Sequence, residues 1–126
     1  MNVVLMESLG IDNDTLNEYI LRLKSKGHDF KICKGSCDIE VQKEQIKDAD
    51  IVILANMPLK GEVIQSAKNL KFIDIAFTGV DHVDIKAAKE LGIDISNASG
   101  YSNESVCELT ICMILTLLRN VREVEK

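Results

Sequence analysis

Five short apolar segments divide the chain and predict β-strands. They are residues 3–6, 30–32, 51–55, 72–77 and 93–95. Each is shorter than a typical buried helix, and the run at 51–55 contains no polar residue. Apolar runs without alternation are typical of parallel strands that are covered on both faces. We therefore expect residues 51–55 to form the middle of a parallel sheet.

The segments between these strands show helical periodicity. The apolar face of the first predicted helix consists of Leu16, Tyr19, Ile20 and Leu23. This face is expected to lie on an apolar surface, with Asp12 or Asp14 as N-cap and Gly27 ending the helix. Shorter helical patterns cover residues 41–47, 63–67 and 83–91. Gly92 follows the last of these and is expected to end it.

The alternation of strands and helices predicts an α/β fold. Strand–helix–strand units connect with right-handed crossovers and build a parallel sheet with helices on both faces. The simplest arrangement is a flavodoxin-like, five-stranded sheet in the order 2-1-3-4-5. With 126 residues, of which 46% are hydrophobic and 28% charged, the chain suits one hydrophobic core.

The last predicted helix, residues 106–121, differs from the others because apolar residues surround its axis. Cys107, Ile111 and Leu115 lie opposite Leu109, Met113 and Leu117. One face of a sheet cannot bury both sides, so we expect this helix to cause self-association, giving a homo-oligomer. Ser105 and Glu108 have the spacing of a capping box at its start.

Charge and termini exclude several classes of function. The formal net charge is −5, and Lys and Arg are interleaved with acids, which argues against a nucleic-acid surface. The chain starts with neither a basic segment nor a long apolar run. We therefore expect no signal peptide, no membrane span and a cytoplasmic protein.

The cysteines and histidines do not predict a metal site. The four cysteines are Cys33, Cys37, Cys107 and Cys112. Cys107 and Cys112 are expected on different faces of one helix, and neither His28 nor His82 belongs to a paired-ligand pattern. We expect no metal and reduced thiols.

The loops after the strands are the candidate binding sites, because ligands of open parallel sheets bind beyond the carboxyl ends of the strands. After the fourth strand, the backbone amides of Thr78, Gly79 and Val80 precede a helix and favour a small anion such as a carboxylate. The alternative is that Gly79 only forms a tight turn and Asp84 only caps the next helix.

Two further polar residues lie in loops at the same predicted edge. Asn56 stands in a proline-containing turn, where it either faces a ligand or bonds its own loop. Tyr101 either contacts a ligand or packs with its hydroxyl in water. His82 has no carboxylate or nucleophile placed by the sequence to make it a general base.

Several ordered motifs together resemble the D-isomer-specific 2-hydroxyacid dehydrogenase family. They are residues 70–73, 78–84, 87–88, 92–93, Asn97, residues 101–102, residues 105–106 and residues 118–120. Linked motifs at consistent separations are more specific than any single one. The resemblance covers the second half of the chain in its motifs and the first half in its strand order.

The resemblance implies a domain division. Residues 1–101 would form a flavodoxin-like substrate domain, and residues 102–126 a crossing helix that leads into a missing NAD-binding Rossmann domain. The seven glycines include no G-x-G-x-x-G. NAD or NADP would thus bind in the full-length enzyme and not to this chain. The family's catalytic Arg, Glu or Asp, and His also belong to the other domain, so we expect no catalytic residue here and no activity of this chain alone.

The resemblance also implies roles for individual residues. The amides of Thr78, Gly79 and Val80 would hold the substrate carboxylate, with Asn56 and Tyr101 lining the cleft. Val106 would border the nicotinamide. The full enzyme would interconvert 2-keto acids and D-2-hydroxy acids. The loop at residues 55–59 differs from the Arg-containing or Ser-containing versions in some branches of the family, so the resemblance does not identify which acid is the substrate.

Other functions remain as alternatives. One is a non-catalytic ligand-sensing or interaction domain of the same fold. A phospho-receiver module is disfavoured because Glu7 and Asn56 stand where its acidic pair and its aspartate belong. A flavin carrier is disfavoured because Glu7 would lie beside a phosphate.

Overall fold

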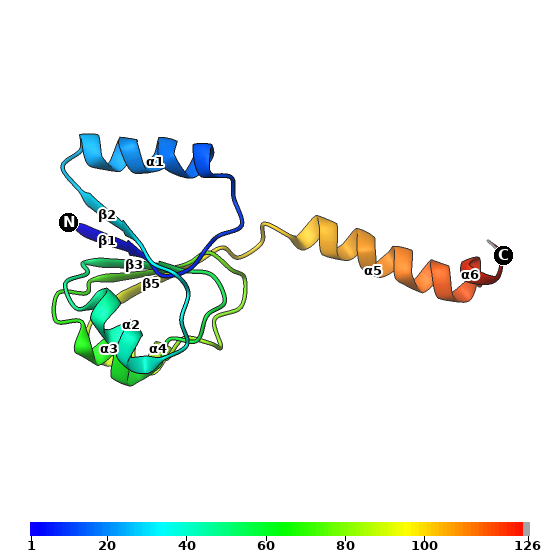
Figure 1. The fold of residues 1–126 in the computed structure, drawn as a ribbon. Coiled ribbons are helices and arrows are strands. Elements are labelled where there is room, and N and C mark those ends of the chain that lie inside the picture. The colour runs from blue at the N-terminus through cyan, green and yellow to red at the C-terminus, as the bar shows by residue number, and fades with distance from the viewer. Residues whose placement is uncertain (125–126) are drawn as a thin grey trace.

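Five parallel strands form the centre of the molecule. The structure, a computed structural model, describes residues 1–124. The strands are β1 (Asn2–Leu5), β2 (Asp29–Ile32), β3 (Ile51–Leu54), β4 (Phe72–Ile75) and β5 (Asp94–Asn97). Their order is β2-β1-β3-β4-β5, as predicted, and Figure 1 shows β3 inside the sheet.

The strand boundaries differ from the prediction by one or two residues, and two of these differences have a clear physical cause. β4 ends at Ile75 rather than at residue 77, because Ala76 makes the last backbone bond to Leu54 before the chain turns away. β5 begins at Asp94, since the backbone N–H of Ile93 bonds back to Ala88 at 2.9 Å. Ile93 therefore belongs to the turn that ends the preceding helix.

The main core lies on one face of the sheet. Apolar residues on neighbouring strands stand in register in the row Val4, Val52, Ile73 and Ile95. Helices α2 (Ile39–Ile46), α3 (Gly61–Ser66) and α4 (Ile85–Glu90) cover this face. Val63 and Ile64 of α3 and Ala88 of α4 are completely buried in it.

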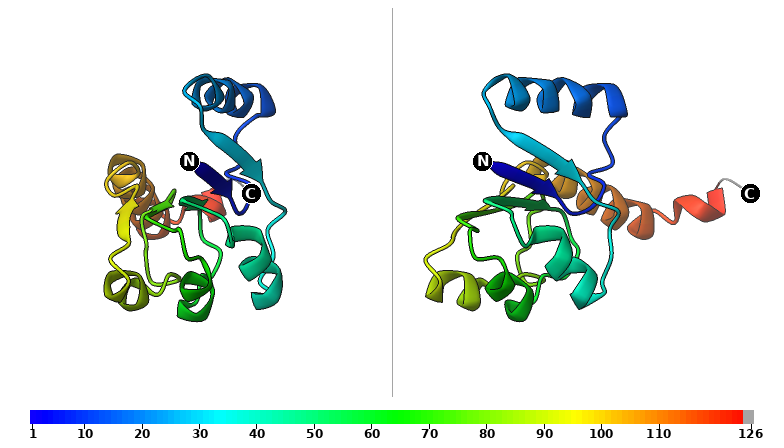
Figure 2. Two further views of the ribbon diagram at one scale, coloured as in Figure 1. Left: turned by 90° about the vertical axis from the view of Figure 1, so that its left-hand side faces the viewer. Right: turned by 60° about the vertical axis from the view of Figure 1, so that its left-hand side comes forward.

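Among residues 1–124, one helix, α1 (Asn13–Ser25), covers the opposite face, so helices lie on both faces as predicted. In Figure 2, α1 stands over β1 and β2. Ile51 and Ile53 of β3 are consequently only partly buried. The expectation that residues 51–55 are covered on both faces was therefore wrong for this side of the strand.

Helix α1 is defined by its caps more than by its apolar face. Asp12, rather than Asp14, is the N-cap, and its carboxylate accepts hydrogen bonds from the backbone N–H and the hydroxyl of Thr15. These bonds lower the pKa of Asp12. Gly27 ends the helix with φ of 78°. The prediction that Tyr19 faces the sheet was wrong: it is 55% exposed, with Arg22 over its ring.

The last helix is interrupted. Helix α5 (Asn103–Leu118) is followed by the short α6 (Val121–Val124), because Asn120 adopts a left-handed conformation with φ of 51°. The N-cap of α5 is Ser102. The predicted capping box was therefore wrong, since Ser105 already lies within the first turn. Within residues 1–124, no helix combines the length and apolar character needed to cross a membrane.

Candidate functional site

The loops after β1, β3, β4 and β5 begin at the same edge of the sheet, where ligands of such folds bind. Two short links join the loops after β3 and β4. The backbone N–H of Leu59 donates to the carbonyl of His82 at 2.9 Å, and that of Asp84 donates to the carbonyl of Leu59 at 3.0 Å. Leu59 and Val83 are both buried. The two loops therefore form one packed unit.

The loop after β4 presents backbone amides without acceptors. Among the described residues, no hydrogen-bond acceptor pairs with the N–H groups of Thr78, Gly79 and Val80. Thr78 is exposed, while Gly79 and Val80 are partly buried. Unpaired backbone N–H groups at this edge of the sheet are available as hydrogen-bond donors to an anion.

Glycine is not needed at residue 79 for the turn itself. A Cβ added to Gly79 would meet nothing closer than Phe77 Cδ1 at 3.9 Å, and the φ of Gly79 lies outside the left-handed region. The alternative that Gly79 only forms a tight turn is thus not supported by the backbone. Asp84 does cap α4, since its carboxylate accepts from the N–H of Ala87 at 2.9 Å.

Asn97, the last residue of β5, binds a backbone carbonyl of this loop. Its side-chain amide donates to the backbone oxygen of Thr78 at 2.8 Å. The backbone N–H of Ala98 adds a bond to Phe77 O at 3.1 Å. Both bonds fix carbonyl groups and leave the amides of the loop available.

The loop after β3 is held by Glu7, which follows β1. One carboxylate oxygen of Glu7 accepts from the backbone N–H groups of Ala55 and Met57, each at 2.8 Å. Asn56 lies between them and is exposed. Within the described chain its side chain makes no hydrogen bond to its own loop, so that alternative is not supported. Met57 is 5% exposed and anchors the loop in the core.

Tyr101 and Val106 lie on the segment that leads away from the sheet. Tyr101 is 70% exposed in the turn before α5, and Val106 is 57% exposed within α5. Figure 1 shows α5 extending away from the sheet, and none of its residues is buried. The loops that carry Asn56 and residues 78–80 are linked through Leu59, His82 and Asp84, whereas Val106 lies on a separate element.

His82 takes part in packing and in the link between loops. Its carbonyl accepts from Leu59, and its ring meets Phe77 edge to face with 6.3 Å between centroids. Its Nε2 is buried and has no hydrogen-bond partner among the described residues. Within residues 1–124, no carboxylate forms a hydrogen bond with this ring.

Sequence reasoning did not select Glu7 and Asn97 as site residues. Glu7 stands two residues after the end of β1, and Asn97 is the last residue of β5, each within hydrogen-bonding reach of a loop at this edge of the sheet. A polar residue at the carboxyl end of a predicted strand could therefore be selected from the sequence as a candidate site residue. The partner, however, lies 48 and 19 residues away, respectively, so the interaction itself depends on sheet order.

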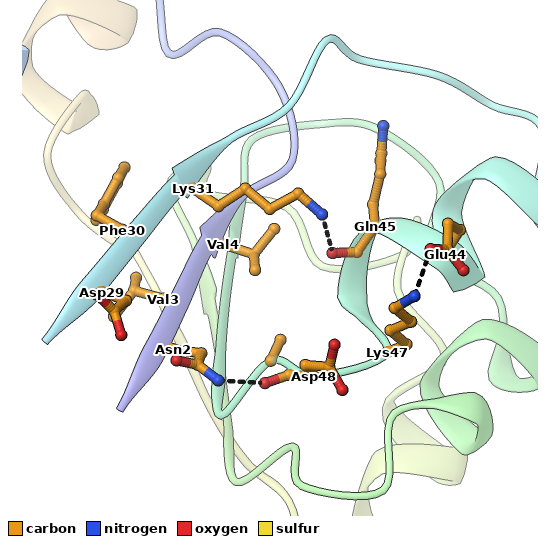
Figure 3. A pocket seen from close by; sticks show the side chains of 11 residues that line it. Asn2, Val3, Val4, Asp29, Phe30, Lys31, Glu44, Gln45, Lys47 and Asp48 are labelled. Atoms are coloured by element: carbon orange, nitrogen blue, oxygen red, sulfur yellow. Dashed lines mark hydrogen bonds and ion pairs between the residues drawn. The ribbon is translucent and has the colours of Figure 1, made fainter.

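A pocket of about 250 Å³ lies elsewhere, between β1, β2 and α2 (Figure 3). Its polar groups pair with one another. Lys31 Nζ donates to the backbone oxygen of Gln45 at 3.0 Å, and the side-chain amide of Asn2 donates to the backbone oxygen of Asp48 at 2.9 Å. This pocket lies at the amino ends of the strands and offers few free polar groups, so we do not assign the site to it.

The described residues do not fit a dinucleotide. In dinucleotide-binding folds, the loop after the first strand is glycine-rich and its amides face the pyrophosphate. Here residues 6–12 contain one glycine, Gly10, and the carboxylate of Glu7, whose charge would repel a phosphate. NAD or NADP is therefore not assigned to these loops.

Known proteins resemble this chain along almost all of its length. Residues 3–121 match the family described as D-isomer specific 2-hydroxyacid dehydrogenase, catalytic domain. A D-3-phosphoglycerate dehydrogenase of Methanocaldococcus jannaschii is 35% identical over 109 residues, which are 86% of this chain and 21% of that protein.

Solved structures give the same result. The NAD⁺-bound 3-phosphoglycerate dehydrogenase of Entamoeba histolytica has a TM-score of 0.77 and 28% identity, over 92% of this chain and 38% of that one. The NAD-dependent formate dehydrogenase of Staphylococcus aureus, in complex with NAD, has a TM-score of 0.76 and 29% identity, over 99% and 39%. The chain thus spans between a fifth and two fifths of these relatives.

Proposed function

This chain belongs to the D-isomer-specific 2-hydroxyacid dehydrogenase family, and we propose that it supplies the substrate-binding domain of an oxidoreductase. The whole protein would interconvert 2-keto acids and D-2-hydroxy acids with NAD or NADP. The task of this chain is to hold the carboxylate of the acid. The observation that carries the proposal is the group of unpaired amides at Thr78, Gly79 and Val80.

The amide group suits a carboxylate for geometric and electrostatic reasons. Backbone N–H groups donate to an anion without bringing a mobile charge, and hydrogen bonds to ionised oxygen are stronger than neutral ones. Gly79 has no side chain that could obstruct the approach of a ligand. 3-Phosphoglycerate and formate, named in the relatives, are chemically different but share a carboxylate.

Asn56 and Tyr101 complete the proposed substrate site. Asn56 stands on the loop that is joined to residues 78–80 through Leu59 and His82, and its free side-chain amide can donate to a substrate oxygen. Tyr101 offers an exposed hydroxyl in the turn after β5. These two side chains would distinguish one acid from another, while the backbone amides hold the group that all of them share.

The division of the whole protein follows from the same proposal. Residues 1–101 form the substrate domain, and residues 102–126 lead into an NAD-binding domain, with Val106 near the nicotinamide. NAD or NADP supplies hydride exchange in that larger protein. The catalytic Arg, acid and His would also lie there, so this chain alone is expected to bind an acid without converting it.

The apolar surface of α5 supports self-association of the chain as given. Leu109 and Leu117 are 59% and 80% exposed, respectively, and Ile111, Leu115 and Leu118 are exposed on the opposite side of the helix. A groove along the helix is lined by Cys107, Ile111, Cys112, Leu115 and Val121, among others. Surfaces of this size are normally covered by protein. In the absence of another domain, a second copy would cover it.

The test is calorimetric titration of the chain with pyruvate and with methyl pyruvate. We expect weak, saturable binding of pyruvate and loss of binding with the ester, because the ester lacks the anionic oxygen. Equal binding of both compounds, or binding of neither, would contradict the proposal. A non-catalytic sensing domain would bind equally well, and it is distinguished by a lack of turnover in the longer protein.

A further inference from the structure

One oxygen of the Glu7 carboxylate accepts hydrogen bonds from two backbone N–H groups of the loop after β3. Ala55 and Met57 lie in the loop directly after β3, and the N–H groups of both donate to one oxygen of Glu7 at 2.8 Å. Two convergent backbone donors at a strand end form the kind of concavity that binds anions. In this molecule the anion is supplied by the chain itself.

The position of Glu7 is closely fixed. It follows Met6, which is completely buried, and it is itself partly buried. A Cβ added to Gly35, in the loop after β2, would lie 3.3 Å from Glu7 Cβ. The loop after β2 therefore packs against the Glu7 side chain, while the carboxylate reaches across to the loop after β3.

The loops after β3 and β4 thus differ in charge and in whether their backbone N–H groups already have an acceptor. The amides at residues 78–80 have no acceptor among the described residues, whereas those of Ala55 and Met57 are paired with a carboxylate. An incoming anion meets free donors at the first loop. At the second loop it meets a negative charge, which repels it.

We infer that Glu7 is a positioning residue that acts as an internal anion. It occupies the donors of the loop after β3, directs the substrate carboxylate to residues 78–80, and holds Asn56 exposed at the rim. Glu7 does not itself touch the substrate. The part of the inference that sends the substrate carboxylate to residues 78–80 rests on the proposed function. The part that assigns anion binding to the amides of Ala55 and Met57 does not.

The test uses ¹⁵N-labelled chain with Glu7→Ala, Glu7→Gln and the control Glu18→Ala, whose side chain is exposed on α1. Formate is the probe. In Glu7→Ala we expect formate to shift the amide resonances of Ala55 and Met57 saturably toward their positions in the unmodified chain. In the unmodified chain and in Glu18→Ala, formate should leave these two resonances unchanged.

Glu7→Gln keeps the shape of the side chain and serves if Glu7→Ala does not fold. Its uncharged oxygen competes less well, so formate should perturb Ala55 and Met57 in this variant also, although more weakly than in Glu7→Ala. If formate affects these amides equally in the unmodified chain and in every folded variant, the inference is wrong.

Pyruvate separates this inference from the proposed function. In the unmodified chain it should move the amides of residues 78–80 and not those of Ala55 and Met57. In Glu7→Ala it should move both groups. Pyruvate could leave the amide resonances of residues 78–80 unshifted in every variant while formate still shifts those of Ala55 and Met57 in Glu7→Ala. That result would contradict the proposed function but support the inference that Glu7 occupies an anion-binding pair of amides.

Discussion

The side-chain amide of Asn97 donates to the backbone carbonyl of Thr78 at 2.8 Å, so the end of β5 fixes the loop that follows β4. The bond engages a backbone carbonyl of the loop and leaves the backbone N–H groups of residues 78–80 free. Preorganised donors bind an anion without an ordering cost at the moment of binding. This relationship connects the order of the strands to the proposed carboxylate site.

Replacing Asn97 by Ala should weaken acid binding. One hydrogen bond of this kind contributes about 1 kcal/mol, which corresponds to about fivefold in the dissociation constant for pyruvate. Calorimetric titration measures the effect. The control is Asn17→Ala, an exposed asparagine on α1, which should leave the affinity unchanged. Equal affinities for the two variants would show that the bond does not support the site.

Gly79→Ala should reduce acid binding and keep the fold. The added Cβ finds room in the protein, with its nearest neighbour at 3.9 Å, but it occupies space beside the free amides. Pyruvate affinity and the melting temperature are the two measurements. An unchanged affinity would mean that the ligand does not approach the backbone at residue 79.

Gly61→Ala is the same substitution at a glycine that has no room for a side chain. Its Cβ would lie 2.6 Å from Asp84 Oδ2 and 3.1 Å from Ala87 Cβ, where α3 packs against the start of α4. Such overpacking typically costs about 1–3 kcal/mol. We expect a lower melting temperature for Gly61→Ala than for Gly79→Ala. The reverse order would contradict the packing described for these helices.

Asp74→Asn should stabilise the fold at neutral pH. Asp74 lies on β4, on the sheet face that α1 covers only in part, and desolvation raises the pKa of its carboxyl above the usual 3.8. Because the folded state then prefers the protonated form, stability falls as pH rises from about 3.8 through the raised pKa of the folded protein.

The Asn variant avoids this loss. Its melting temperature should exceed that of the unmodified chain at pH 7, and the difference should vanish below the ordinary pKa of 3.8. Asp94→Asn, an exposed position on the neighbouring strand, is the control. A difference that persists at low pH would point to a cause other than ionisation.

Leu115→Glu should reduce self-association. Leu115 lines the groove along α5 and is 53% exposed, so a charge there would be buried in any contact between two copies of the helix. Sedimentation velocity should show dimer for the unmodified chain and monomer for the variant. Leu21→Glu on α1, 67% exposed, should behave like the unmodified chain. A strictly monomeric unmodified chain would refute the self-association.

The sequence predicted the sheet order and the positions of most elements. Apolar runs such as residues 51–55 and the helix end at Gly27 depend on neighbours along the chain and were identified, and Asp12 was one of two proposed N-caps. The errors arose at positions where tertiary contacts determine which way a side chain faces, or where the conformation of one residue determines where a helix ends. Tyr19 faces outward beside Arg22, and Asn120 breaks the last helix with a positive φ.

The candidate site was predicted only in part. Residues 78–80 and Asn56 were selected because they follow strands, and the structure joins their loops through Leu59 and His82. Glu7 and Asn97 were not selected, because each acts on a backbone group that is distant in sequence. Pairings of that kind become visible only when the strands are placed side by side.

The central claim is that backbone amides of the loop after β4 hold the carboxylate of a 2-keto acid. The most direct measurement is a titration of the ¹⁵N-labelled chain with pyruvate, followed residue by residue. We predict saturable shifts, with one common dissociation constant, for the amides of Thr78, Gly79 and Val80, and no shift with methyl pyruvate. Shifts confined to residues outside this loop, or identical shifts with the ester, would contradict the claim.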